Sequence, residues 1–126
     1  MTAKHILIID DEEDIQEVAR LALELVGGWK VSTASSGHEG IIKASAEQPD
    51  AILLDVMMPE MDGIATFKKL QADPTTKQIP VILLTAKVQS QDRRQFALLE
   101  VTGVISKPFK TMNLADRVSE ILHWNE

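Results

Sequence analysis

Residues 51–63, with the sequence AILLDVMMPEMDG, place a single carboxylate at the end of an apolar run. Residues 51–54 are all apolar, which is typical of a strand buried on both faces of a parallel sheet. Asp55 closes this run, and a segment containing Pro59 and Gly63 follows. Asp55 could cap a turn or take part in chemistry, and the ends of the other strands decide between these two interpretations.

Five short apolar runs alternate with five amphipathic stretches along the 126 residues. The runs predict strands over residues 5–9, 29–34, 51–55, 79–85 and 103–106. The stretches between and after them predict helices over residues 12–26, 36–47, 63–71, 88–99 and 111–122. Run 29–34 is polar and alternating, which indicates an edge strand. This strict alternation predicts right-handed crossovers and a three-layer α/β sandwich around a parallel sheet.

Local signals define several of the expected helices. The first helix has apolar residues at helical spacing, and we expect its core face to carry Ile15, Val18, Ala19, Ala22, Leu25 and Val26. The second opens with a capping box, in which Ser36 precedes Glu39 by three residues. The last is expected to bury Leu114, Val118, Ile121 and Leu122, with Trp124 docking on it.

Composition excludes several classes of function. The chain has 13 basic and 19 acidic residues, a net charge of -6 and no basic cluster, so a nucleic-acid partner is not expected. It has no cysteine, which leaves neither disulfides nor thiolate chemistry. No apolar run approaches the roughly 18 residues that span a bilayer. We therefore expect a cytoplasmic protein without a membrane partner.

The strand ends carry the candidate functional residues. Ligands of such sheets bind outside the carboxyl ends of the strands, and the residues there are Asp10, Asp11, Asp55, Thr85, Ala86, Lys107 and Pro108. Each has a structural explanation by itself; the acids, for instance, also suit a helix N-terminus. Together, clustered carboxylates repel unless a cation joins them, and hard oxygen ligands suit Mg²⁺ shared with a phosphate. An ammonium and a hydroxyl complete a phosphoryl site with a carboxylate nucleophile.

Four motifs resemble the receiver domain of two-component response regulators. They are IIDDEED after the first strand, LLDVMMPEMDG after the third, VILLTA after the fourth and SKPF after the fifth. Four motifs in this order, spanning nearly the whole chain, make the resemblance specific. It implies a flavodoxin-like (βα)₅ fold whose five-stranded parallel sheet has the order 2-1-3-4-5. It also implies a signalling domain that catalyses only its own phosphorylation and dephosphorylation, not an enzyme acting on other substrates.

The resemblance implies roles for the residues at the strand ends. Asp55 would be the phosphoacceptor, taking the phosphoryl group from a sensor histidine kinase or a histidine phosphotransfer protein. The ligands of Mg²⁺, or of Mn²⁺ as the alternative ion, would be Asp11 directly, Asp10 mostly through water, Asp55 and the main-chain carbonyl of Met57. The phosphoryl oxygens would meet Lys107, which would first pair with Asp55, the Thr85 hydroxyl and the main-chain N–H groups of Met57 and Ala86. Pro59, Gly63 and Pro108, the last after a peptide bond that is cis in the family, would shape the loops.

One position departs from the family pattern. Receivers usually carry an aromatic ring three residues before the lysine, and Val104 stands there. Its stiff β-branched side chain cannot act as that ring. Thr85 would then be the remaining half of the switch, and we expect signalling to a downstream protein to depend on movement of residues 86–92.

Other functions compete with this interpretation. A haloacid-dehalogenase-like phosphatase needs a second Asp two residues after the nucleophile, where Met57 stands. A flavin-binding module needs a glycine- and hydroxyl-rich phosphate loop after the first strand, where DDEED would repel phosphate. Within the family, we expect residues 1–126 to form one receiver without an output domain. Its use as a phosphorelay shuttle, a partner-docking protein or a detached input domain stays open.

Overall fold

The computed structural model describes residues 4–85 and 101–124. Its elements follow one another as β1 (His5–Ile9), α1 (Glu13–Leu25), β2 (Lys30–Ala34), α2 (Gly37–Glu47), β3 (Ala51–Asp55), α3 (Gly63–Ala72), β4 (Val81–Thr85), β5 (Gly103–Ser106) and α5 (Thr111–Leu122). The helix expected over residues 88–99 lies outside the described residues. None of the described helices is long and apolar enough to cross a membrane.

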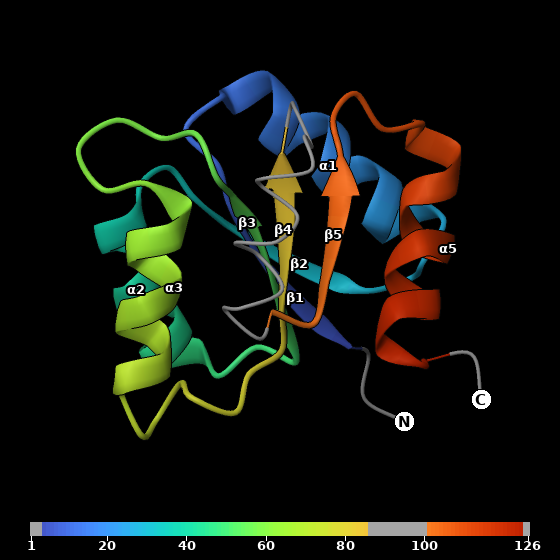
Figure 1. Cartoon of the computed structure of the whole chain (residues 1–126). Coiled ribbons are helices and arrows are strands. Elements are labelled where there is room, and N and C mark those ends of the chain that lie inside the picture. Colours follow the sequence, from blue (N-terminus) through green and yellow to red (C-terminus); the bar gives the residue numbers. More distant parts are fainter. Residues whose placement is uncertain (1–3, 86–100, 125–126) are drawn as a thin grey trace.

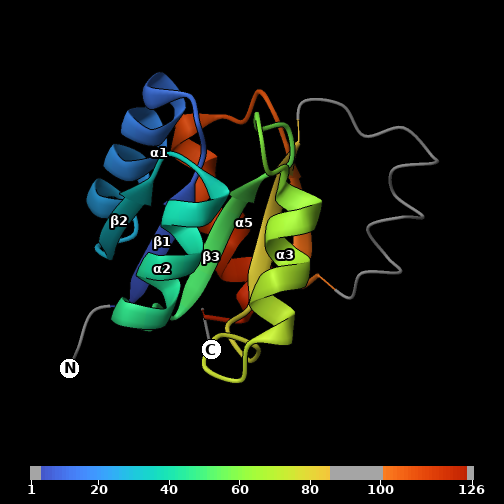
Figure 2. The same cartoon turned by 90° about the vertical axis from the view of Figure 1, so that its left-hand side faces the viewer.

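The five strands form one parallel sheet in the order β2-β1-β3-β4-β5, which confirms the expected topology and places β2 at an edge. Helices α1 and α5 cover one face of the sheet, while α2 and α3 cover the other (Figure 1). Figure 2 looks onto α2 and α3, with α5 behind the strands. The fold is therefore the predicted three-layer sandwich.

Each face of the sheet has its own hydrophobic core, because successive side chains of a strand point to opposite faces. On β1, Ile6 and Ile8 pack toward α1 and α5, whereas Leu7 and Ile9 pack toward α2 and α3. All four are 0% exposed. Burial on both faces explains why the central strands carry unbroken runs of Ile, Leu and Val.

The first helix buries a different face from the one predicted. Ala19, Ala22 and Leu23 are its buried residues. Val18, Leu25 and Val26 are 41%, 80% and 53% exposed, so their assignment to the core was wrong. The apolar residues occupy a wider part of the helix circumference than the part that faces the sheet. Leu25 lies two residues, or about 200°, beyond the buried Leu23 and therefore faces solvent.

Two strand boundaries also differ slightly from the predictions. The strand expected over residues 79–85 begins at Val81, because Pro80 has no N–H to donate to the ladder and contributes only its carbonyl, to Ile52 N–H at 2.9 Å. The strand expected over residues 29–34 begins at Lys30, one residue after Trp29.

The predicted helix ends are largely confirmed. Ser36 Oγ accepts from the N–H of Glu39 at 3.1 Å, as the capping box requires, although the Glu39 carboxylate reaches the N–H of Ser35 at 3.2 Å. Trp124 docks as expected beside the core under α5. Its ring meets Trp29 edge-on, with centroids 5.0 Å apart.

Candidate functional site

The parallel register brings four of the predicted site residues to one edge of the sheet. Asp10 continues β1 beyond its last residue and donates its N–H to the Ala34 carbonyl at 3.0 Å. Asp55 is the last residue of β3, and Thr85 is the last of β4. Lys107 follows β5 and donates its N–H to the Thr85 carbonyl at 2.7 Å. The arrowheads of β4 and β5 mark this edge in Figure 1.

Lys107 connects two buried carboxylates. Its Nζ lies 2.8 Å from Asp10 Oδ2 and 3.3 Å from Asp55 Oδ1. Asp10 is 0% and Asp55 is 2% exposed, so water can screen neither charge well. The expected pair of Lys107 and Asp55 is present, but the shorter contact is with Asp10. One cation thus serves two acids.

Within residues 4–85 and 101–124, two carboxylate oxygens at this edge have no hydrogen-bond donor. Asp10 Oδ1 accepts the N–H of Glu12 at 2.9 Å, and Asp55 Oδ1 accepts the N–H of Met57 at 3.3 Å. Asp11 Oδ1 and Asp55 Oδ2 are buried and accept no hydrogen bond within the part of the chain that the structure describes. Buried acceptors without partners are costly, and a cation between them would satisfy both.

Oxygen atoms of four acids converge here. One carboxylate oxygen from each of Asp10, Asp11, Glu12 and Asp55 lies within 4.8 Å of the others, which is a group able to hold a metal ion. An all-oxygen donor set suits a hard cation such as Mg²⁺. The geometry and the two unsatisfied oxygens therefore fit the expected ion.

Glu12 belongs to this group, although sequence reasoning did not select it. It is the residue before α1 and has an extended backbone, with φ -91° and ψ 111°. Its Oε1 lies 3.8 Å from Lys107 Nζ. The run of acids over residues 10–14 was the only signal, and it does not reveal which of them turns toward Asp55.

The electrostatic environment shifts two pKa values. Burial, followed by the charge of Asp10, raises the pKa of Asp55 from 3.8 to about 6, even though Lys107 and the Met57 N–H act in the opposite direction. Burial alone would lower the pKa of Lys107, but its hydrogen bond to Asp10 and the charges of both acids together raise it. At neutral pH, Asp55 is thus ionised in an environment that disfavours its charge.

The structure also describes several of the other predicted residues. The Met57 side chain is 71% exposed, so it is its backbone that faces the site. Thr85 is 3% exposed at the end of β4. Val104 is partly buried against the core under α2 and α3, opposite Leu83 of β4. The Lys107–Pro108 peptide bond is cis. Ala86 and the expected mobile loop of residues 86–92 lie outside the described residues.

Gly63 closes the loop that leaves the site. Its N–H donates to the Val56 carbonyl at 3.0 Å. A Cβ at this position would lie 2.3 Å from the Asp55 carbonyl oxygen and 2.7 Å from Val56 Cα. Only glycine permits this approach of two backbone segments, which gives Gly63 a structural role close to Asp55.

Replacing Gly63 with alanine is expected to lower the free energy of unfolding by about 1–3 kcal/mol, because the clash is with backbone atoms that cannot rotate away. Urea denaturation measures the change. Gly28→Ala is the control: a Cβ there meets nothing within 4 Å, and only its φ of +69° opposes the substitution. Gly28→Ala should leave the pKa of Asp55 unchanged. Equal stability of Gly63→Ala and the unchanged chain would contradict the tight closure of this loop.

Comparison with known proteins places this chain in a family. Residues 6–119 match the model of the response regulator receiver domain. The chain is 39% identical to the alkaline phosphatase synthesis transcriptional regulatory protein PhoP of Bacillus subtilis over 98% of its own length and 50% of the relative's. It is 38% identical to the response regulator PleD of Caulobacter vibrioides, over 96% of this chain and 26% of that protein.

Solved structures agree with these relatives. The chemotaxis response regulator CheY4 of Vibrio cholerae has a TM-score of 0.88 and 28% identity, covering 95% of this chain and 99% of that one. The N-terminal domain of a response regulator receiver protein from Methanoculleus marisnigri has a TM-score of 0.76 and 35% identity, covering 94% and 95% of the two chains.

The chain belongs to the response regulator receiver domain family of two-component systems. Members of this family are signalling domains that interact with histidine kinases or phosphotransfer proteins. The chain spans about half of the length of the PhoP relative and about a quarter of that of PleD.

Proposed function

We propose that Asp55 accepts a phosphoryl group from a phosphohistidine of a sensor kinase or phosphotransfer protein in a Mg²⁺-dependent reaction, and that the product changes the binding of a protein partner. The observation that carries this proposal is the buried Asp55 Oδ2, which has no donor among the described residues and lies beside a group of acids able to hold a cation.

The chemistry assigned to Asp55 is nucleophilic. With a pKa of about 6 it is a carboxylate at neutral pH. One Asp55 oxygen would attack phosphorus while the other stays in contact with the site: Oδ1 accepts the Met57 N–H and contacts Lys107, and Oδ2 has no donor among the described residues. The new O–P bond forms as the N–P bond to the donor histidine breaks, and the electron pair of that bond leaves with the imidazole. The product is an aspartyl phosphate.

The neighbouring residues supply charge and orientation. Lys107 would pair with Asp55 before the transfer and with the phosphoryl group after it. The Thr85 hydroxyl and the N–H groups of Met57 and Ala86 would donate to the phosphoryl oxygens. Asp10, Asp11, Asp55 and the Met57 carbonyl would hold Mg²⁺, with Glu12 as an additional oxygen donor. When bound, the ion neutralises charge on the transferring group. Phosphoryl transfer needs little more than this positioning and neutralisation.

The test is incubation with acetyl phosphate and Mg²⁺, followed by intact mass spectrometry. We expect the mass of one phosphoryl group to be added to the unchanged chain. Asp55→Asn should add none, because the nucleophile is gone, and chelation of the metal should prevent labelling. Asp116→Asn, the same change on the exposed side of α5, is the matched control and should label normally. An unlabelled chain, or full labelling of Asp55→Asn, would overturn the proposal.

A further inference from the structure

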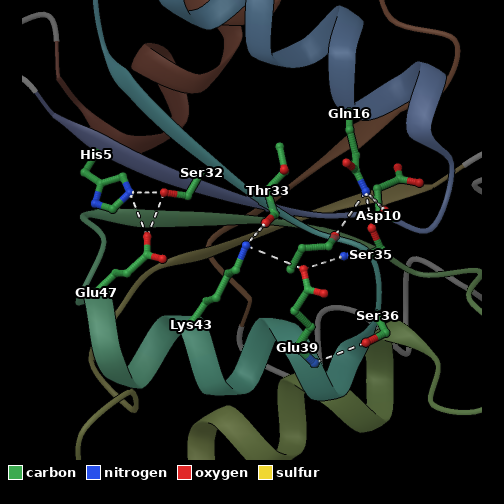
Figure 3. Close-up of polar contacts among 11 residues, drawn as sticks. His5, Asp10, Gln16, Ser32, Thr33, Ser35, Ser36, Glu39, Lys43 and Glu47 are labelled. Atoms are coloured by element: carbon green, nitrogen blue, oxygen red, sulfur yellow. Dashed lines mark hydrogen bonds and ion pairs between the residues drawn. The ribbon is translucent and has the colours of Figure 1, made fainter.

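A carboxamide on α1 bridges the ends of two strands behind the acidic site. Gln16 Nε2 lies 2.5 Å from the Asp10 carbonyl oxygen, 3.3 Å from the Ala34 carbonyl oxygen and 3.1 Å from Ser35 Oγ (Figure 3). Two of these three atoms are carbonyl oxygens, which can only accept, so the nitrogen of the carboxamide has to face them. Gln16 thus joins the residue after β1, the last residue of β2 and the residue after β2 through one donor group.

The contact of Gln16 with the Asp10 carbonyl means that all polar groups of Asp10 are held. The Asp10 N–H donates to the Ala34 carbonyl at 3.0 Å, its Oδ1 accepts from the Glu12 N–H at 2.9 Å, and its Oδ2 contacts Lys107 at 2.8 Å. The carbonyl is the remaining polar group of Asp10, and Gln16 holds it. Every polar group of Asp10 therefore has a partner.

The Asp10 carbonyl belongs to the peptide that joins Asp10 to Asp11. Because a peptide is planar, holding this oxygen fixes the direction in which the chain continues to Asp11. In the described part of the chain, Asp11 Oδ1 and Asp55 Oδ2 are the two buried side-chain oxygens without a donor. The placement of Asp11 relative to Asp55 thus depends on the orientation of a peptide that Gln16 restrains.

The main chain on either side of Ala34 is held by α2. The N–H of Ser35 donates to Glu39 Oε1 at 3.2 Å, and Glu39 Oε1 lies 3.5 Å from Lys43 Nζ. Lys43 Nζ in turn donates to the Thr33 carbonyl at 2.6 Å (Figure 3). Helix α2 thereby holds the end of β2 in place. Gln16 connects this end of β2 to Asp10.

We propose that Gln16 is a positioning residue that holds the Asp10–Asp11 peptide so that Asp11 and Asp55 face a common cation, and that it thereby sets the affinity of the site for Mg²⁺. This inference rests on the proposed function. Gln16 is not itself among the residues of the acidic group, and its effect is exerted through the main chain. Partners of this indirect kind affect metal affinity by about 10–100-fold in other proteins.

The test compares two variants of similar size by calorimetric titration with Mg²⁺. Gln16→Met removes the donors and is expected to weaken Mg²⁺ binding about tenfold. Gln16→Glu adds a negative charge, which by electrostatics alone would tighten cation binding. A carboxylate cannot donate to the two carbonyls, so positioning predicts weaker binding for this variant as well. Tighter binding by Gln16→Glu would overturn the inference.

Labelling by acetyl phosphate separates positioning from general damage. For Gln16→Met, we expect the Mg²⁺ concentration for half-maximal rate to rise about tenfold, while the rate at saturating Mg²⁺ stays within about twofold of the unchanged chain. Gln71→Met is the matched control, since Gln71 Nε2 also donates to a carbonyl, that of Lys77 at 3.2 Å, but on α3. This control should leave both quantities unchanged.

The outcomes distinguish the two proposals. An unchanged chain that binds no Mg²⁺ and takes no label would overturn the proposed function, and this inference with it. If the unchanged chain binds Mg²⁺ and takes the label, and Gln16→Met binds Mg²⁺ with the same affinity, the inference alone is overturned. A rate reduced equally at all Mg²⁺ concentrations would also overturn it. If Gln16→Met does not fold, the sign of the change in Gln16→Glu decides.

Discussion

Replacing Lys107 with methionine is expected to lower the free energy of unfolding by about 3–5 kcal/mol at pH 8 in the absence of divalent ions. Lys107 is 10% exposed and lies within 3.3 Å of both Asp10 and Asp55. Methionine keeps much of the side-chain length but removes the charge, which leaves two buried carboxylates facing each other. Urea denaturation of the purified variant measures the loss.

Two further measurements define the cause of this loss. Mg²⁺ should stabilise Lys107→Met more than it stabilises the unchanged chain, because the added cation offsets the missing one. Acidification should also reduce the loss, since protonation of a carboxyl removes the repulsion. Lys110→Met, on an exposed lysine three residues away, is the control and should change stability by less than about 0.5 kcal/mol. A loss insensitive to both Mg²⁺ and pH would indicate that Lys107 stabilises the fold by packing instead.

Replacing Asp55 with asparagine is expected to raise the free energy of unfolding by about 1–3 kcal/mol at pH 8 without divalent ions. The shift of the Asp55 pKa from 3.8 to about 6 means that ionised Asp55 disfavours the folded state. One pKa unit corresponds to about 1.4 kcal/mol, which sets an upper limit near 3 kcal/mol. Asparagine has no charge to bury, while Lys107 keeps its contact with Asp10.

The pH dependence of this gain follows from the direction of the shift. Between the unfolded pKa of 3.8 and the folded pKa of about 6, the folded chain binds more protons than the unfolded one. The stability contributed by protonated Asp55 is therefore present below this window and is lost as the pH rises through it. The advantage of Asp55→Asn should be nearly absent near pH 4 and constant above about pH 7.

Denaturation of both chains from pH 4 to pH 8 tests this prediction, with Asp116→Asn as the control on an exposed carboxylate. A gain of equal size at both ends of the range would mean that the charge of Asp55 is not its source. Mg²⁺ should narrow the difference at pH 8, because it stabilises only the chain that retains the full set of ligands.

The strands and most site residues could be predicted from the sequence. Strands buried on both faces need unbroken apolar runs. The apolar runs of β1, β3 and β4 therefore suffice to predict these strands. The carboxyl ends of parallel strands share one edge, which is enough to group Asp10, Asp55 and Lys107. The Ser36 cap was equally accessible, because its partner is three residues away.

Other features depend on distances between residues far apart in the chain. The sequence determined that Asp10, Asp55 and Lys107 share an edge. Only the tertiary structure decided that the closer contact of Lys107 is with Asp10, 97 residues away. It also decided that Glu12 turns toward the acids and that Gln16 donates to the carbonyl of Asp10. The buried face of α1 and the raised pKa of Asp55 also emerged only there. Alternation and caps act within a few residues and leave a local pattern. Burial, pKa values and the sharing of one cation between two acids depend on which distant atoms meet, and no local pattern records that.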